Sequence, residues 1–218
     1  MKKIIIYFLM SSPGFLFSQI GIKAGVNFAN VSKASSINNS SRSGFTIGLL
    51  LAPPSKNIIS SRTELIFSRQ GYDYKTNTNT GNVNLDYIMM PQYMCINITK
   101  YFQLQLGAQM AFLISARADS SATTGGSGNN PYGKLLDFYN KFDYGYGGGI
   151  EIHPVSGLLI GARVNISLSN LYKDIGTTTP GATPSFIPKV NVKNNLFQIF
   201  AGWKFGKTGT KKKKEESS

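Results

Sequence analysis

The sequence has very little of what most catalytic and metal sites are built from. Its 218 residues include one cysteine, Cys95, and one histidine, His153. A single cysteine excludes an intramolecular disulfide and a Cys-x-x-Cys motif, and a single histidine excludes a histidine-rich metal site. Ser-His-Asp chemistry would need His153, which lies beside Pro154 in a predicted short turn. We therefore expect no enzyme, and no catalytic, metal-binding or cofactor-binding residues.

The chain also lacks long apolar runs. No stretch of about 18 apolar residues follows Gln19, so no transmembrane helix is expected. The N-terminus has the pattern of a secretory signal peptide, with Lys2 and Lys3 before a mainly apolar run over 4–17. Ser18 is small, as the residue before a cleavage site should be. We predict a signal peptide over 1–18, cleaved near Ser18/Gln19.

Acidic residues are scarce relative to basic ones. The chain has 23 Lys and Arg against 10 Asp and Glu, a formal net charge of +13. No dense basic patch is interleaved with aromatic residues, so nucleic acid is not an expected partner. The segment 207–218 carries the one basic run, and it is open to two interpretations: a solvated, disordered tail, or a tether to anionic headgroups, cell-wall polymer or a protein. The basic run is Lys211, Lys212, Lys213 and Lys214.

What the chain has in abundance is alternation with a period of two. Over 102–112, Phe, Leu, Leu, Ala, Met and Phe alternate with Gln, Gln, Gly, Gln and Ala, and 158–169 alternates as regularly. Such alternation puts each set on one face of a β-strand. The least regular strand is 83–98, which is fairly apolar on both faces and contains Pro91. The predicted strands are 20–30, 43–52, 58–74, 83–98, 101–117, 141–153, 157–170 and 194–206.

The connections between these strands alternate in length. Three are short: 53–57, 99–100 and 154–156. Four are longer and rich in Ser, Thr, Asn and Gly: 31–42, 75–82, 118–140 and 171–193. Short turns at one end and long polar loops at the other are typical of outer-membrane barrels, whose sheet must close because lipid cannot satisfy a free edge. We predict an all-β fold over 19–206: a closed antiparallel transmembrane β-barrel of eight strands in the bacterial outer membrane, with short periplasmic turns, long outward loops and lipid around it.

Six charged residues fall on the polar faces of the predicted strands and would point into the barrel. Buried charges are costly unless paired, and eight strands leave an interior just wide enough for side chains. The sequence therefore favours a salt-bridged network that fills the lumen, with a narrow polar pathway or ligand site as the alternative. The six residues are Lys23, Arg62, Glu64, Glu151, Arg163 and Lys204.

A soluble, lipocalin-like barrel has the same period with the apolar set inside. Alternation alone does not distinguish it from a membrane barrel. The membrane barrel is favoured because the polar faces consist mainly of small or uncharged residues, not the Lys and Glu of a solvated surface. Aromatic residues near the predicted strand ends would form the interfacial belts of such a barrel. They include Phe28, Tyr101, Phe102, Phe112, Phe142 and Trp203.

Several segments resemble the PorT-like outer-membrane β-barrel family of Bacteroidetes. GIKAGVNF over 21–28 resembles the opening strand of that family, and YIMMP over 87–91 its aromatic-aliphatic-Pro strand. The segment 142–151, with three consecutive glycines, resembles part of its middle hairpins. The segments 159–163 and 197–205 resemble its last two strands. The resemblance implies a barrel and, through the founding type, an association with the secretion of surface proteins.

Together these observations predict a non-enzymatic integral outer-membrane barrel. We expect a structural or accessory component of a surface or secretion assembly, with other envelope proteins as its partners. The alternative is a stand-alone binding or adhesion barrel that acts through its extracellular loops.

Overall fold

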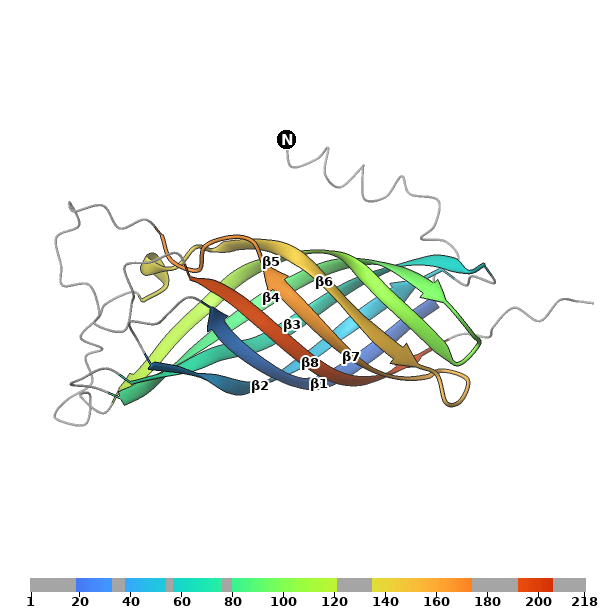
Figure 1. The fold of residues 1–218 in the computed structure, drawn as a ribbon, viewed down its shortest axis with the longest axis horizontal. Coiled ribbons are helices and arrows are strands. Elements are labelled where there is room, and N and C mark those ends of the chain that lie inside the picture. Colours follow the sequence, from blue (N-terminus) through green and yellow to red (C-terminus); the bar gives the residue numbers. More distant parts are fainter. Residues whose placement is uncertain are drawn as a thin grey trace, which may run out of the picture.

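The protein forms a closed ring of antiparallel strands in which each strand pairs with its neighbours in sequence and the last strand pairs with the first (Figure 1). A computed structural model describes residues 19–32, 38–53, 57–75, 80–120, 135–173 and 192–205. The strands are β1 (Gln19–Ser32), β2 (Asn38–Ala52), β3 (Ile59–Lys75), β4 (Thr80–Asn97), β5 (Phe102–Ser120), β6 (Phe142–Ile152), β7 (Leu158–Ser167) and β8 (Lys193–Lys204). The predicted fold, an all-β closed antiparallel barrel of eight strands, is confirmed.

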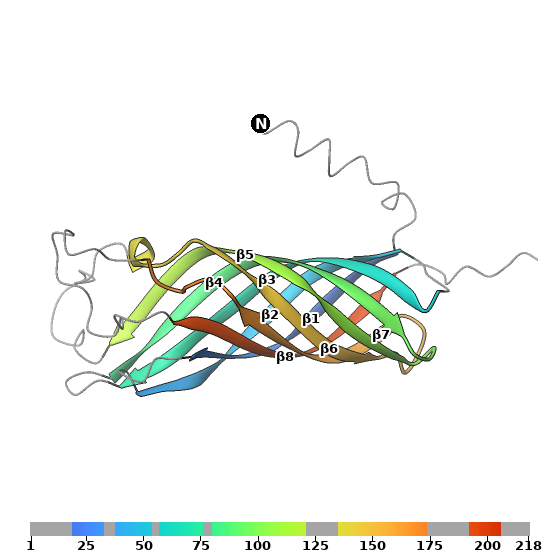
Figure 2. The same ribbon diagram turned by 45° about the horizontal axis from the view of Figure 1, so that its top comes forward.

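The strands run obliquely to the long axis of the barrel in both ribbon views (Figure 1, Figure 2). One end carries the short connections 53–58, 98–101 and 153–157, and we call it the turn end. The opposite end, where β1 leads to β2 and β3 leads to β4, is the loop end. The 3-10 helix η3 (Leu135–Phe138) lies at the loop end. No helix in the described part of the chain is long and apolar enough to cross a membrane.

The alternation of the sequence becomes an apolar outer surface and a polar interior. In β7, burial alternates residue by residue, so that Arg163 and Asn165 are inside while Val164 is exposed on the outside. This is the arrangement predicted for a membrane barrel and the opposite of the lipocalin-like alternative. Other outward apolar residues are Ile22, Val26, Ile47, Leu49, Leu65, Leu106, Ile150, Ile160 and Ile199.

The barrel is taller on one side than on the other. Strands β2 to β5 have 15, 17, 18 and 19 residues, whereas β6, β7 and β8 have 11, 10 and 12. The additional length projects beyond the other strands at the loop end (Figure 1). Two of the loops predicted from polar composition, 31–42 and 75–82, are therefore shorter than predicted, because 31–32, 38–42, 75 and 80–82 belong to strands. This projecting part of β2–β5 is called the outer extension below.

Two register shifts separate the outer extension from the rest of the barrel. One lies in the β2–β3 ladder between Ser41 and Thr46. The other lies in the β4–β5 ladder, where Tyr87 pairs with Leu113 and Asp86 with Ser115, so that Ile114 is an extra residue on β5. Such bulges re-aim the side chains that follow them. Beyond this level the faces are exchanged, with apolar residues inside and polar residues outside.

The side chains of the outer extension show this exchange. On the outside, Arg42 pairs with Asp73 and Arg69 with Asp86, both at 2.7 Å. The inside is a buried apolar cluster that includes Tyr72, Tyr74, Val83, Leu85, Tyr87, Leu113, Leu171, Val192 and Leu196. The inner face of β4 is apolar from Val83 to Cys95, and its outer face becomes apolar below this level, which explains why 83–98 is apolar on both faces. Its Pro91, which has no N–H to donate, lies at a break in the β3–β4 ladder between Thr63↔Gln92 and Ile66↔Met89.

Candidate functional site: the barrel interior

The structure places all six charged residues of interest inside the barrel, in its half nearer the turn end. Inward positions on five strands supply them: Lys23 on β1, Arg62 and Glu64 on β3, Glu151 on β6, Arg163 on β7 and Lys204 on β8. We call these six residues the charged layer. Since β1, β3 and β7 are not consecutive in the ring, the layer joins walls that no backbone ladder connects.

Glu64 is the centre of one part of the charged layer. Its Oε2 accepts a hydrogen bond from Lys23 Nζ at 2.9 Å, and Arg163 donates to both of its oxygens at 2.9 and 3.1 Å. The Arg163 guanidinium also lies over the ring of Tyr93, 4.0 Å from the centroid. Lys23 Nζ lies 4.0 Å from the centroid of Phe200. Two cations therefore share one carboxylate, and aromatic faces supplement that partner.

Glu151 is the centre of the other part. Arg62 donates to both of its oxygens, at 2.5 and 2.8 Å, and Gln105 donates to Oε2 at 2.9 Å. Lys204 Nζ is more distant, at 3.7 Å from Oε1. Gln105 connects the two parts, because its Oε1 accepts a hydrogen bond from Arg163 Nη2 at 2.5 Å. Bidentate arginine–carboxylate pairs of this kind combine strength with fixed geometry.

The charges of the layer do not balance. It contains four cationic side chains and two carboxylates, and both carboxylates are buried and already shared. The sum over these six side chains is +2. Arg62 is 1% exposed, and its Nε is a buried nitrogen without a hydrogen-bond partner within the described residues.

Gly149 on β6 allows close packing against β7 at the position of Arg163. It pairs with Arg163 across the β6–β7 ladder. A Cβ at Gly149 would lie 2.3 Å from the carbonyl oxygen of Ala162, too close for any side chain. The glycines of β6 thus have a structural role in the packing of the barrel wall.

A layer of uncharged polar side chains continues the filling toward the loop end. Asn27 Nδ2 donates to Ser68 Oγ at 2.9 Å, and Gln198 Nε2 donates to Asn27 Oδ1 at 3.0 Å. Asn194 Nδ2 donates to Gln70 Oε1 at 2.5 Å. The alternation of the sequence puts these residues inside, but nothing in their type had marked them as a network.

Three tyrosines form the hydrogen-bonded centre of the apolar cluster at the loop end. The Tyr72 hydroxyl lies 2.9 Å from that of Tyr139 and 2.5 Å from that of Tyr172. Burial raises the pKa of Tyr172 to about 12 and raises the pKa of Tyr139 well above its ordinary value. We call these tyrosines and the apolar residues around them the aromatic layer. The sequence analysis missed it because Tyr139 and Tyr172 lie in segments that read as polar loops.

The turn end, in contrast, opens into a cavity of about 780 Å³. Arg62, Cys95, Gln103 and Lys204 are among the residues that line it, and His153 lies at its mouth. His153 follows β6, donates its backbone N–H to the carbonyl of Tyr101 at 2.8 Å, and places Nε2 3.1 Å from Glu151 Oε1. Within the described ranges, no group of three or more His, Cys, Asp or Glu side chains is placed to hold a metal ion.

Several predicted features fall outside the residues that the structure describes. These are the signal peptide over 1–18, the basic run Lys211, Lys212, Lys213 and Lys214, and most of the loops 118–140 and 171–193.

Comparison with known proteins relates this architecture to a family. Residues 11–173, most of the chain, match the family described as the outer membrane protein beta-barrel domain. The chain belongs to this family. The protein is therefore an outer-membrane β-barrel, and the apolar outer surface of its ring meets lipid.

Three solved structures are similar to this outer-membrane barrel. The attachment invasion locus protein Ail of Yersinia pestis has 16% identity and a TM-score of 0.48, covering 86% of this chain and 99% of that chain. Neisserial surface protein A has 16% identity and a TM-score of 0.46, covering 85% and 97%. OprG of Pseudomonas aeruginosa has 13% identity and a TM-score of 0.45, covering 86% and 96%. No curated protein matches the sequence.

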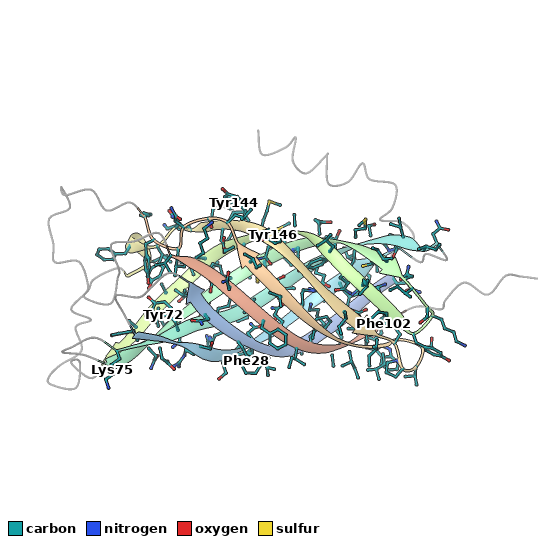
Figure 3. All side chains as sticks on the ribbon, viewed as in Figure 1. Phe28, Tyr72, Lys75, Phe102, Tyr144 and Tyr146 are labelled. Carbon is teal, nitrogen blue, oxygen red and sulfur yellow. The ribbon has the colours of Figure 1, made fainter. Side chains whose placement is uncertain are left out.

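Aromatic side chains on the outside of this outer-membrane barrel lie where interfacial belts are expected. Toward the loop end, Phe28 contacts Phe197 and Phe112 contacts Phe142, with centroids 6.2 and 5.2 Å apart. Tyr144 and Tyr146 are also exposed, and Figure 3 shows Tyr144 on the side toward the loop end, Tyr146 nearer the middle of the barrel and Phe102 toward the turn end. Of the six predicted belt residues, all but Phe102 are exposed, and Phe102 is half-buried; Tyr101 lies in the turn beside the cavity.

Proposed function

We propose that this outer-membrane barrel is a non-enzymatic, non-conducting interaction protein, a structural or accessory component of a surface or secretion assembly. The observation that carries the proposal is the outer extension of β2–β5. The filled lumen supports it as well, since the charged layer, the layer of uncharged polar side chains beside it and the aromatic layer together close the channel through the barrel. The resemblance to the PorT-like family points to secretion in particular.

The edge of β5 gives the outer extension a means of contact. Strand β6 pairs with β5 as far as Phe112↔Phe142, and Leu113 N then donates to the carbonyl of Lys141 at 2.8 Å. From Ile114 onward, β5 has a ladder partner on its β4 side only, as far as the described residues show. Backbone groups along such an edge can pair with a strand of another protein.

The polar outer face of the extension would supply specificity. It carries the ion pairs Arg42–Asp73 and Arg69–Asp86 and the exposed side chain of Arg117. Charged groups at the rim of an interface select partners and raise association rates more than they add affinity. A partner that adds a strand to β5 would lie beside these charges.

Site-specific cross-linking tests the proposal. A photoreactive amino acid is placed at Arg117 on the outer extension and, as a matched control, at Leu106 on the same strand within the lipid-facing band. We expect a discrete adduct with another envelope protein from position 117 in growing cells and none from position 106. No adduct from 117, or the same adducts from both positions, would overturn the proposal. An adduct from 117 only after an external surface is added would favour the stand-alone adhesion alternative.

We also propose that residues 1–18 are removed on export and that the turn end faces the periplasm. In support, β1 begins at Gln19 and pairs there with Ala52. N-terminal sequencing of protein from the outer membrane should begin at or near Gln19, and a mature protein that retains 1–18 would contradict this. In this orientation the basic run 211–214 would lie on the periplasmic side, where it would act as the tether.

A further inference from the structure

The surplus of positive charge in the charged layer is not distributed evenly. Lys23 and Arg163 are paired with Glu64 in the deeper part, whereas Arg62 and Lys204 line the cavity at the turn end. Both oxygens of Glu151 are engaged by Arg62, so that Lys204 Nζ, at 3.7 Å, is left beyond hydrogen-bond distance. Low-dielectric surroundings make an uncompensated charge of this kind a strong attractor for an anion.

Arg62 is already held by its partners. Both of its terminal nitrogens donate to Glu151, and Nη2 also donates to Gln103 Oε1 at 3.0 Å, so that Lys204 supplies the donor that is left for a ligand. Neutral polar side chains, Asn97 and Gln103, line the same cavity. The described lining contains no Asp or Glu, but it contains Arg62, Lys100 and Lys204. The cavity wall is therefore cationic, with amide groups beside the cations.

The size of the cavity indicates what kind of anion it takes. A volume of about 780 Å³ lies within the range of small-molecule sites and far exceeds that of a bare ion. Apolar side chains at its mouth, Ile58, Ile98 and Val155, suit the carbon skeleton of an organic molecule. We propose that the turn-end cavity binds a small organic dianion, held by Lys204 Nζ beside the positive charge of Arg62. Its charge of −2, from two carboxylates or from a phosphate monoester, compensates the +2 of the charged layer.

Titration calorimetry on the folded full-length protein in detergent tests this inference. The probes are succinate for the dicarboxylates and glycerol 3-phosphate for the phosphate monoesters, with glycerol as the uncharged control. We expect saturable one-to-one binding of at least one dianion and none of glycerol. The preferred probe identifies the anionic group. Binding should weaken as the salt concentration rises, because the attraction is electrostatic.

Two lysines of the cavity provide a matched pair of variants. Lys204→Gln removes the charge beside Arg62 and should weaken binding about tenfold, as expected for a charge that contacts the ligand. Lys100→Gln removes the same charge from the exposed mouth, where Lys100 Nζ lies 4.7 Å from the centroid of the Tyr101 ring, and should change affinity less than about twofold. Lys204→Arg keeps the charge and should bind nearly as the unmodified protein does, which separates loss of charge from loss of fold.

Two results would overturn the inference: no saturable binding of either dianion to the unmodified protein, or equal affinity in Lys204→Gln and the unmodified protein. Since the cavity lies at the opposite end from β5 residues 114–120, failure here leaves the partner surface untouched, and the reverse also holds.

Discussion

The two ends of the interior are filled by opposite chemistry. The charged layer near the turn end is built from ions that pair across the ring, whereas the aromatic layer near the loop end is built from apolar side chains and a cluster of hydroxyls. The outer surface changes in the opposite sense, from apolar around the charged layer to polar on the outer extension. Ion pairs therefore lie inside the barrel at the level of the charged layer and on its outer face at the outer extension.

The comparison shows where one strand pattern can serve two environments. In lipid, the polar set must turn inward and satisfy itself, which requires partners from several strands. In water, the apolar set must turn inward and pack, as in an ordinary soluble core. The register shifts at Ser41/Thr46 and at Asp86/Tyr87 lie between the part of the barrel with an apolar outer surface and the outer extension with its polar outer surface. The two layers should consequently respond differently to substitution.

The largest effect should come from breaking the charged layer. Glu64→Leu removes the partner of both Lys23 and Arg163 and leaves two buried cations, so we expect a loss of roughly 3–5 kcal/mol in the free energy of unfolding. Urea unfolding in lipid vesicles measures it. As a control, Asp73→Asn breaks the half-exposed Arg42–Asp73 pair of the outer extension and should cost at most about 1 kcal/mol.

A triple variant shows whether the stability lost in Glu64→Leu comes from the broken ion pairs or from the burial of unpaired charges. Combining Glu64→Leu with Lys23→Met and Arg163→Met removes all the charges of that cluster and should recover most of the lost stability. A Glu64→Leu variant as stable as Asp73→Asn would show that the charged layer is not held together by its ion pairs.

A smaller effect is expected in the aromatic layer. Tyr72→Phe leaves the buried hydroxyls of Tyr139 and Tyr172 without their shared partner, at a cost of about 1–3 kcal/mol. Replacing all three tyrosines by phenylalanine removes every stranded hydroxyl and should cost less than the single substitution. Urea unfolding again measures both variants. Costs that add up over the three positions would contradict a cooperative hydroxyl cluster.

Alkaline pH should destabilise the aromatic layer by ionising Tyr172. The pKa of Tyr172 is raised from about 10 to about 12, so the folded state favours the neutral hydroxyl. Its contribution to stability is fully present below pH 10 and is lost as the pH rises through about 12. A tyrosinate absorbance titration should show a late step whose amplitude Tyr172→Phe lowers by one tyrosine. If the late step has the same amplitude in this variant and in the unmodified protein, Tyr172 does not contribute to it, and burial in the cluster does not raise the pKa of Tyr172.

The smallest signal should be electrical. Since each layer fills its part of the lumen, the protein in a planar lipid bilayer should give no steady ion current. Glu64→Leu, which empties part of the charged layer, is the variant in which brief openings are expected first. Stable conductance steps from the unmodified protein would show that the layers do not close the lumen.

The sequence predicts the ring well and the interior only in part. Strict alternation over 102–112 and 158–169 gave the strands and their faces, because a period of two is a property of each strand alone. That Glu64 joins Lys23 to Arg163 was beyond prediction, because the contact depends on the register of strands that are not neighbours. The aromatic layer was missed for another reason: Tyr139 and Tyr172 stand in polar surroundings, and only the fold brings them to Tyr72.

The pairing of β1 with β8 has a consequence for how the molecule is made. Gly21 pairs with Lys204 and Ser32 with Lys193, so the ladder that closes the ring joins residues from opposite ends of the strand sequence. Every other ladder joins strands that are consecutive along the chain. Contacts this distant in sequence form slowly. We therefore expect this ladder to form last, and until it forms β1 and β8 each present an open edge that could pair with another chain.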